Sequence, residues 1–259
     1  MVRGDLIVLA ERAEHAATGQ QYRNACELLP DPAQAEISIG GGSARYFGSR
    51  LPVSNKAVGL TDAVISDGDL ERLSAFYRER DAPARTVASE LSDPTLAARL
   101  EAAGYRVAER QHGLIGELHG LAGAYDSRVR IATDLRAWAS VAAGTWLDAD
   151  LAICAIWGDI LGAGDGVVPL ELIEDGRVAA VAAANAAGEM GTLFFGNTLP
   201  WARNRGLQTA LIRHRIKLLQ DAGCRYVRAT VAPDGSSERN ARAAGLRLVY
   251  DRAVWELPC

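Results

Sequence analysis

The sequence has little of what metal sites and disulfide frameworks are built from. Its four cysteines, Cys26, Cys154, Cys224 and Cys259, lie far apart, with no Cys-x-x-Cys pair and no histidine at metal-ligand spacing. Isolated cysteines are typical of reduced thiols, because disulfide frameworks and zinc sites need cysteines in characteristic groups. We therefore expect three buried or half-buried thiols, a terminal fourth, a reducing compartment and no metal site.

The sequence also lacks a long apolar run. No window approaches the roughly 18 apolar residues that a membrane-spanning helix requires. The first residues, Met1 to Glu11, become charged too early for a signal peptide. We therefore expect a cytoplasmic protein that does not engage a membrane.

Neither sign of charge dominates the chain. Its 259 residues have a formal net charge of −4, with 49% apolar and 23% charged residues, as in a globular protein of one large or two ordinary domains. A general nucleic-acid binder needs a basic surface, which this balance does not supply. We therefore expect no nucleic-acid partner, and any basic patch must be local. The segment from Arg203 to Arg215 is the obvious one.

That local segment has the most informative pattern in the chain. A β-prone run, Thr192–Phe195, leads into a turn that contains two arginines and Gly206, and apolar residues follow at helical spacing from Leu207 to Leu219. The first N–H groups of a helix have no partner within it, and the helix dipole is positive there. Gly206 has no Cβ and allows close backbone approach. The pattern predicts a phosphate site, and a solvated basic helix start is the alternative.

The remaining pattern alternates between strands and helices. Three glycines at 40–42 indicate a hairpin rather than a phosphate loop, because no helix and no basic residue accompany them. In the first half we expect helices at 5–28, 69–80 and 93–103, strands at 35–39, 44–47, 55–60 and 85–91, and a strand pair within 105–118. In the second half we expect helices at 133–138, 147–157, 207–219 and 236–244, a hairpin at 169–183, and strands at 192–195, 226–231, 246–250 and 253–257.

The two halves repeat each other in order. Ala102–Val107 matches Ala243–Leu248, and the Asp-Ala pair at 81–82 matches the pair at 221–222 at nearly the same offset. Where the second half has its basic turn, the first has Asp67, Asp69 and Glu71, which stabilise a helix start but repel a diphosphate. We therefore expect a first domain at 1–120 that binds no phosphate and a second at 130–259 that does.

The basic turn and its flanking elements resemble the GNAT superfamily of N-acyltransferases, which use acyl-CoA donors. The family signature, Gln/Arg-x-x-Gly-x-Gly/Ala, is matched by Arg203-Asn-Arg-Gly206-Leu-Gln208, except that Gln208 replaces the usual small residue. Residues 198–200 look like the family's strand end, 229–233 like its splayed neighbouring strand and 237–246 like its last helix. The match covers 165–257, and the first half looks like a degenerate copy.

The resemblance implies an α/β protein of two GNAT-like lobes, each a mixed, mostly antiparallel twisted sheet flanked by helices. It implies acetyl-CoA as the donor and an amine of a small molecule or peptide as the acceptor, and it leaves a homodimer open. The residues it assigns to the cofactor are Thr198, Leu199, Arg203, Asn204, Arg205, Gly206, Leu207, Gln208, Thr209, Ser237 and Asn240.

Two catalytic groups of the family are missing. Ala241 stands where many members have a tyrosine as general acid, and Thr192 where a carboxylate often acts as base. The resemblance therefore implies catalysis by positioning, in which a deprotonated amine attacks the thioester and a backbone N–H near Asn197–Leu199 holds the carbonyl oxygen. Asn197 and Asn240 are the catalytic candidates, and water or another side chain takes the proton.

Other interpretations fit the same residues. Tyr250, Glu189, Glu171 and His214 are weaker polar candidates, and His214 is expected on the exposed face of its helix. The missing acid and base also suit an acyl-CoA-binding sensor or regulatory protein without catalysis. A phosphate-binding fold for another nucleotide is a third possibility.

Overall fold

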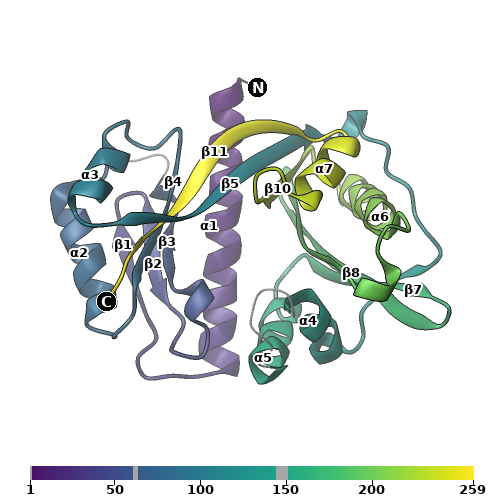
Figure 1. Cartoon of the computed structure of the whole chain (residues 1–259), viewed down its shortest axis with the longest axis horizontal. Coiled ribbons are helices and arrows are strands. Elements are labelled where there is room, and N and C mark those ends of the chain that lie inside the picture. Colours follow the sequence, from purple (N-terminus) through teal and green to yellow (C-terminus); the bar gives the residue numbers. More distant parts are fainter. Residues whose placement is uncertain (1, 61–63, 144–150) are drawn as a thin grey trace. The chain divides into compact units, whose positions relative to one another are not determined.

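The computed structural model describes residues 2–60, 64–143 and 151–259, so the first four residues of the helix expected at 147–157 lie outside the described part (Figure 1). The chain forms two compact units. Unit 1 comprises Met1–Gly113 and Val249–Cys259, and unit 2 comprises Leu114–Leu248.

Unit 1 is built on an antiparallel sheet with one parallel pair. Its elements are α1 (Arg3–Leu28), β1 (Ala35–Ile39), β2 (Gly42–Tyr46), β3 (Lys56–Val58), α2 (Asp67–Arg78), β4 (Ala84–Ser89), α3 (Leu96–Ala102), most of β5 (Arg106–Glu117) and most of β11 (Arg247–Leu257). The strand order is β1-β2-β3-β4-β11-β5, with β3 parallel to β4. β11 pairs antiparallel with β4 from Arg252–Ser89 to Leu257–Ala84.

Unit 2 has a meander followed by a parallel strand. Its elements are the end of β5, β6 (Val129–Ile131), α4 (Leu135–Ala143), α5 (Leu151–Gly162), β7 (Val167–Glu174), β8 (Arg177–Ala187), β9 (Met190–Thr198), α6 (Leu207–Asp221), β10 (Tyr226–Val231) and α7 (Ser236–Ala243). The strand order is β5-β10-β9-β8-β7-β6. β7, β8 and β9 are antiparallel neighbours, whereas β9 and β10 are parallel.

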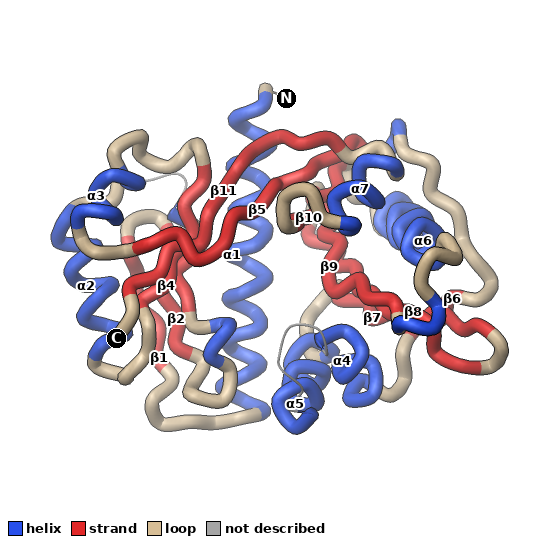
Figure 2. Tube along the Cα trace, in the orientation of Figure 1, coloured by secondary structure: helices blue, strands red, loops and turns tan. Residues whose placement is uncertain are grey.

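Helices cover both faces of the unit 2 sheet. Figure 2 shows α6 and α7 on one side of β8–β10 and α4 and α5 on the other. On the first side, Ile212 and Ile216 of α6 and Ala241 of α7 pack with Leu193 and Val227. On the other side, the buried Trp138 of α4 donates from Nε1 to the Leu170 carbonyl of β7 at 3.1 Å. The sheet of unit 2 therefore lies between two helical layers.

The expected fold class is confirmed. The order β1-β2-β3-α2-β4-α3-β5 recurs as β7-β8-β9-α6-β10-α7-β11, which is the predicted repeat. Local signals explain two of its turns. Ser66 and Asp69 form a capping box at the start of α2, and Asp175 and Gly176 both adopt positive φ in the hairpin between β7 and β8.

Two expectations about strands were wrong. The stretch 105–118 contains one long strand, β5 (Arg106–Glu117), instead of a pair, and the two strands expected at 246–250 and 253–257 are replaced by the single strand β11 (Arg247–Leu257). The glycines of β5 serve packing instead of turning. A Cβ on Gly113 would lie 2.1 Å from the Tyr250 ring, and one on Gly116 would lie 2.9 Å from Leu121. The part of β11 from Val249 onward belongs to unit 1, where residues 252–257 pair with β4.

The cysteines are free thiols, as expected: Cys154 and Cys224 are buried, Cys26 is half-buried and the terminal Cys259 is exposed. Within the described ranges, no helix combines the length and the apolar character needed to cross a membrane.

Candidate functional site

The carboxyl half of β9 separates from β10. The parallel pairing of the two strands begins at Met190–Tyr226 and ends at Leu193–Ala229. β10 therefore does not accompany residues 194–198, and no other described strand pairs with β9 on that side, where a ligand could pair as a strand would. Gly196, in the middle of this segment, is exposed.

A β-bulge lies at the point of separation. The register between β8 and β9 passes from Ala183–Phe194 directly to Val181–Asn197, so Phe195 and Gly196 together lie opposite one residue of β8. Phe195 has a φ of 52°, which is unusual for a bulky residue. A bulge re-aims the strand and is common beside active sites. Here it directs the end of β9 away from β10.

The turn that follows leads into α6 through left-handed backbone. After a short 3-10 helix, Pro200–Ala202, Asn204 and Gly206 adopt φ values of 62° and 74°. Gly206 is the N-cap of α6, no side chain caps the helix, and the space beyond Gly206 is open. Among the described residues, the N–H groups of Leu207, Gln208 and Thr209 donate to no protein acceptor. These three N–H groups and the helix dipole provide an anion site at the start of α6.

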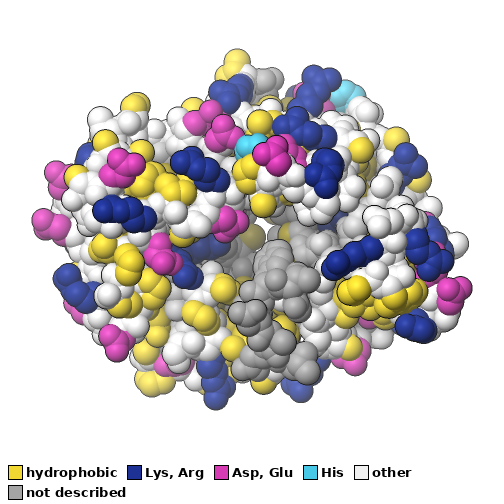
Figure 3. Space-filling view, viewed as in Figure 1, with side chains coloured by type: hydrophobic (Ala, Val, Ile, Leu, Met, Phe, Trp, Pro, Cys, Tyr) yellow, Lys and Arg dark blue, Asp and Glu magenta, His cyan; other side chains and the backbone are white. Residues whose placement is uncertain are grey.

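The side chains of the basic turn are partly engaged elsewhere. Arg205 places Nη1 3.2 Å from Glu174 of β7, a carboxylate that also binds Arg128 at 3.0 Å. Arg203 donates from Nε to the Thr198 carbonyl at 3.3 Å and is exposed. Arg205 is therefore already paired, whereas Arg203 is held at the turn with its guanidinium in contact with solvent. Basic and acidic side chains are interspersed on the face shown in Figure 3, as the small net charge leads one to expect.

Gln208 braces the helix against the strand. Its Nε2 donates to the Thr198 hydroxyl at 2.9 Å, and its Oε1 lies 2.9 Å from the position of a Cβ on Gly196. The long side chain therefore fills the space between the first turn of α6 and the end of β9. One N–H of its side-chain amide is therefore used inside the protein, whereas its backbone N–H belongs to the start of α6.

The predicted catalytic pair is split between two elements. Asn197 donates from Nδ2 to the Val141 carbonyl of α4 at 2.6 Å, so its side chain ties β9 to the α4 layer. Asn240 is half-buried and Ser237 is exposed on α7, which packs against both α6 and β10. Ala241, at the position of the family's tyrosine, is 3% exposed and packs in the core.

The structure places the cofactor candidates in two groups. Those between Thr198 and Thr209 are brought together at the turn between β9 and α6. Ser237 and Asn240 lie on α7. Leu199 uses its N–H in a 3.0 Å bond to the Ala179 carbonyl of β8, so that group is occupied.

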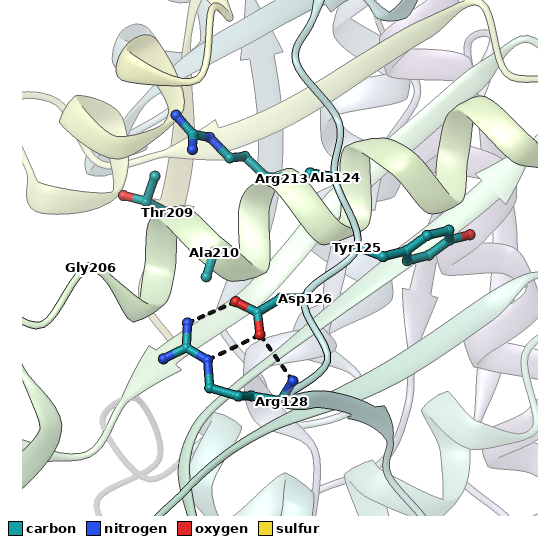
Figure 4. Close-up of a pocket in the computed structure, with 8 residues that line it drawn as sticks. All are labelled: Ala124, Tyr125, Asp126, Arg128, Gly206, Thr209, Ala210 and Arg213. Carbon is teal, nitrogen blue, oxygen red and sulfur yellow. Dashed lines mark hydrogen bonds and ion pairs between the residues drawn. The ribbon is translucent and has the colours of Figure 1, made fainter.

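A shallow pocket of 410 Å³ lies on the flank of α6 (Figure 4). Its lining residues are Ala124, Tyr125, Asp126, Arg128, Gly206, Thr209, Ala210 and Arg213. Asp126 and Arg128 face each other and form an ion pair of 2.7 Å, and the hydrogen bonds from Arg128 lower the pKa of Asp126 to about 2. These two charges neutralise each other, whereas Arg213 adds a positive charge to the lining, and Gly206 and Thr209 belong to the start of α6.

The expectation that His214 is exposed was wrong. Its side chain is buried with 7% of the residue exposed, because the segment that contains Tyr125 and Asp126 crosses α6 above it. The Asp126 N–H donates to Nδ1 of His214 at 3.1 Å, and the Tyr125 ring packs edge-on at 5.0 Å. Burial lowers the pKa of His214. His214 is therefore an internal hydrogen-bond acceptor.

The other weak candidates also have partners away from this turn. Glu171 is buried on β7 and pairs with Arg130 at 3.0 Å. Glu189 precedes β9 and lies 3.9 Å from Arg225. Tyr250, in unit 1, donates to Glu11 of α1 at 2.6 Å. None of these three residues belongs to the end of β9.

The sequence interpretation missed Arg215. This residue is 3% exposed and donates to the carbonyl oxygens of Ala183 on β8 and Phe194 on β9, which are paired next to the bulge. A signal was present, because Leu207, Leu211, Arg215 and Leu219 recur every four residues and form one face of the helix. A charged residue in the middle of an apolar stripe is a buried-charge candidate.

Comparisons with known proteins agree on the fold. No family model matches the sequence, and no curated protein matches it. Among solved structures, a GCN5-related N-acetyltransferase from Kribbella flavida is 16% identical with a TM-score of 0.67, and the alignment covers 93% of this chain and 94% of that one. A tandem GNAT protein from the clavulanic acid biosynthesis pathway is 13% identical with a TM-score of 0.62 and the same coverages. A GNAT-family putative acetyltransferase from Novosphingobium aromaticivorans is 18% identical with a TM-score of 0.57, covering 85% of this chain and 90% of that one.

Proposed function

Because the chain has the GNAT fold in a tandem arrangement, we propose that it is an N-acyltransferase with its acyl-CoA site in unit 2. The donor is acetyl-CoA or another short acyl-CoA, and the acceptor is an amine of a small molecule or peptide. One observation carries the proposal: within the described residues, an unpaired strand edge, a left-handed Gly206 and three N–H groups without protein acceptors follow one another between β9 and α6.

Each part of this arrangement suits one part of CoA. The diphosphate binds the N–H groups of Leu207, Gln208 and Thr209, and the exposed Arg203 adds a positive charge beside them. The pantetheine arm pairs with backbone groups of residues 196–198, since the Leu199 N–H is already bonded to β8. In unit 1, Asp67 and Asp69 begin the equivalent helix α2 and bind Arg99 and Arg72, which disfavours a diphosphate there.

The transfer is direct. The lone pair of a neutral amine attacks the thioester carbon, a C–N bond forms, and negative charge develops on the carbonyl oxygen. Collapse of this intermediate breaks the C–S bond, sulfur receives the electron pair, and the ammonium proton passes through water to the thiolate. A backbone N–H at the end of β9 holds the oxygen. The Asn197 amide serves to position the strand because it is bonded to α4, and Asn240 remains a polar candidate on α7.

A sensor or regulatory protein that binds acyl-CoA without turnover is the second candidate. It is favoured by the lack of an acid and a base at the family positions. Ala241 is buried in the core, and the register partners of Thr192 are Asn185 and Arg228, neither of which is a carboxylate.

Calorimetry and a thiol-release assay test both candidates. We expect CoA and acetyl-CoA to bind more tightly than ADP or ATP, and free thiol to appear with at least one member of a panel of primary amines. Binding without thiol release from any amine would favour the sensor. Equal affinity for CoA, ADP and ATP would contradict an acyl-CoA site and favour a general nucleotide site.

A further inference from the structure

Arg215 is a buried charge without a buried counter-charge. It lies on the face of α6 that packs on β8 and β9, in the stripe that also contains Leu207, Leu211 and Leu219, and it is 3% exposed. In the described part of the chain, no carboxylate lies within ion-pair distance of its guanidinium. A leucine would complete the stripe without a charge.

All its acceptors are neutral carbonyl oxygens. Nε donates to Leu211 at 3.2 Å, and Nη1 donates to Ala183 at 3.1 Å and to Phe194 at 3.3 Å. Nη2 is 3.8 Å from the position that a Cβ on Gly196 would occupy. Ala183 and Phe194 are the last register pair before the bulge, so the guanidinium lies where β9 separates from β10.

If Arg215 served only to stabilise the fold, its burial would be unfavourable. Burying an ion without an opposite charge costs several kcal/mol, and burial lowers the pKa of Arg215 to about 10. The group is nevertheless charged at neutral pH. Carbonyl oxygens can be satisfied by neutral donors, and hence hydrogen bonding alone does not account for the charge. A buried positive charge is useful where negative charge develops during a reaction.

We propose that Arg215 is a positioning residue for acyl transfer, which clamps the β9 bulge and polarises the strand edge that receives the thioester. This inference rests on the proposed function. The hydrogen bond to the Phe194 carbonyl polarises the peptide group between Phe194 and Phe195, which strengthens the N–H at its other end as a donor. The charge itself favours an oxyanion beside residues 194–196, because a buried charge is screened less than one in water.

Arg215 takes no part in proton transfer. While the C–N bond forms, it stabilises charge on the carbonyl oxygen, and when the C–S bond breaks that charge moves to sulfur. The protein lacks the family's acid and base at the usual positions, so preorganised electrostatics of this kind would supply a larger share of catalysis.

The test measures the carbonyl stretch of bound [1-¹³C]acetyl-CoA by difference infrared spectroscopy, which needs no acceptor. Wild type is compared with R215M, R215Q and R215K, and K217M is the matched control, since it removes a positive charge two residues further along α6. Calorimetry with acetyl-CoA and thermal unfolding accompany each spectrum. For any amine that wild type acetylates, kcat and the KM for acetyl-CoA are also measured.

We expect wild type to shift the stretch to lower frequency than in solution. R215Q and R215M should bind acetyl-CoA as wild type does but lose at least half of that shift, with kcat reduced about tenfold and KM unchanged. R215K should retain more of the shift than R215Q, and K217M all of it. A purely structural role would alter unfolding or affinity without this selective spectral change.

Several results would overturn the inference. One is a wild-type frequency in R215Q or R215M. A second is that the Arg215 variants lose acetyl-CoA binding together with the shift of the carbonyl stretch, and a third is that all three variants unfold. The last is that wild type binds acetyl-CoA without any shift of the carbonyl stretch. In that last case the proposed acyl-CoA site stands while the role of Arg215 fails. A wild type that does not bind acetyl-CoA refutes the proposed function itself.

Discussion

The side-chain amide of Gln208 donates a hydrogen bond of 2.9 Å to the hydroxyl of Thr198 and so joins the first turn of α6 to the last residue of β9. This bond crosses the turn that we propose as the diphosphate site. In the GNAT signature the position of Gln208 is normally small, and here the larger residue fills the gap over Gly196. The turn is therefore braced by a side chain while its backbone N–H groups at the helix start stay open.

Q208A should loosen this brace without removing the site. We expect the free energy of unfolding to fall by about 1 kcal/mol, the usual net value of one hydrogen bond, and CoA to bind within a few-fold of wild type, since the backbone N–H groups remain. Urea unfolding and calorimetry measure the two quantities. T198V removes the same bond from the other end, and the double variant should cost less than the sum of the two. Additive costs would mean that the two residues are not coupled.

Two replacements of Gly206 distinguish the effect of a negative charge from the effect of side-chain size. G206D and G206N introduce side chains of nearly equal size, and both residue types tolerate the left-handed backbone of position 206 better than others do. We expect G206D to abolish CoA binding, because a carboxylate would lie against the diphosphate, and G206N to weaken binding much less. Calorimetry with CoA gives the comparison. Equal affinities for the two variants would remove the diphosphate from this turn.

The two arginines of the turn should contribute unequally. R203A should weaken CoA binding by about 1.5–3 kcal/mol, the range for a hydrogen bond to a charged group. R205A should cost less, because Arg205 is paired with Glu174 at 3.2 Å and must leave that partner to reach the ligand. CoA affinities measured at low and high salt test whether R203A loses more than R205A. We expect the affinity to depend more on salt in wild type and R205A, which retain Arg203, than in R203A. A greater loss in R205A than in R203A would reverse the assignment.

Local signals in the sequence predicted most of the fold. The Ser66–Asp69 capping box and the Asp175–Gly176 turn act through neighbouring residues, so their elements could be placed without tertiary information. The repeat located α2 and α6 at corresponding positions. The strand pair expected within 105–118 is one strand, in which Gly113 leaves room for the ring of Tyr250, a residue far along the chain. Glycine alone does not reveal whether it serves a turn or a close approach.

The sequence predicted the part of the candidate site that consists of backbone groups. A glycine between a strand and a helix identifies the open N–H groups, since their availability follows from helix geometry. The partners of side chains could not be predicted in this way. Asn197 binds the Val141 carbonyl and Arg205 binds Glu174 only because distant segments pack beside β9 and β7. Burial of Arg215 was detectable in the four-residue spacing, but its position under the bulge required the register of β8 and β9.

His214 should make unit 2 sensitive to acid. Burial is the main cause of its lowered pKa; the charge of Arg215 acts in the same direction, and Asp126 opposes both. The unfolded chain therefore binds a proton on this residue before the folded chain does. Stability due to the neutral imidazole is complete above the unfolded pKa of 6.5 and is lost as the pH falls through the lower folded pKa. Protonation also removes Nδ1 as acceptor for the Asp126 N–H.

Urea unfolding at a series of pH values between 7.5 and 5 would measure this effect. H214N is the informative variant, because its side-chain oxygen can accept the Asp126 N–H without titrating. We expect the stability difference between wild type and H214N to shift in favour of H214N as the pH falls. His15 in unit 1 also has a pKa lowered by burial, and its contribution is common to both proteins and cancels in the difference. A difference that stays constant across this range would show that His214 has the same pKa in the folded and unfolded chains.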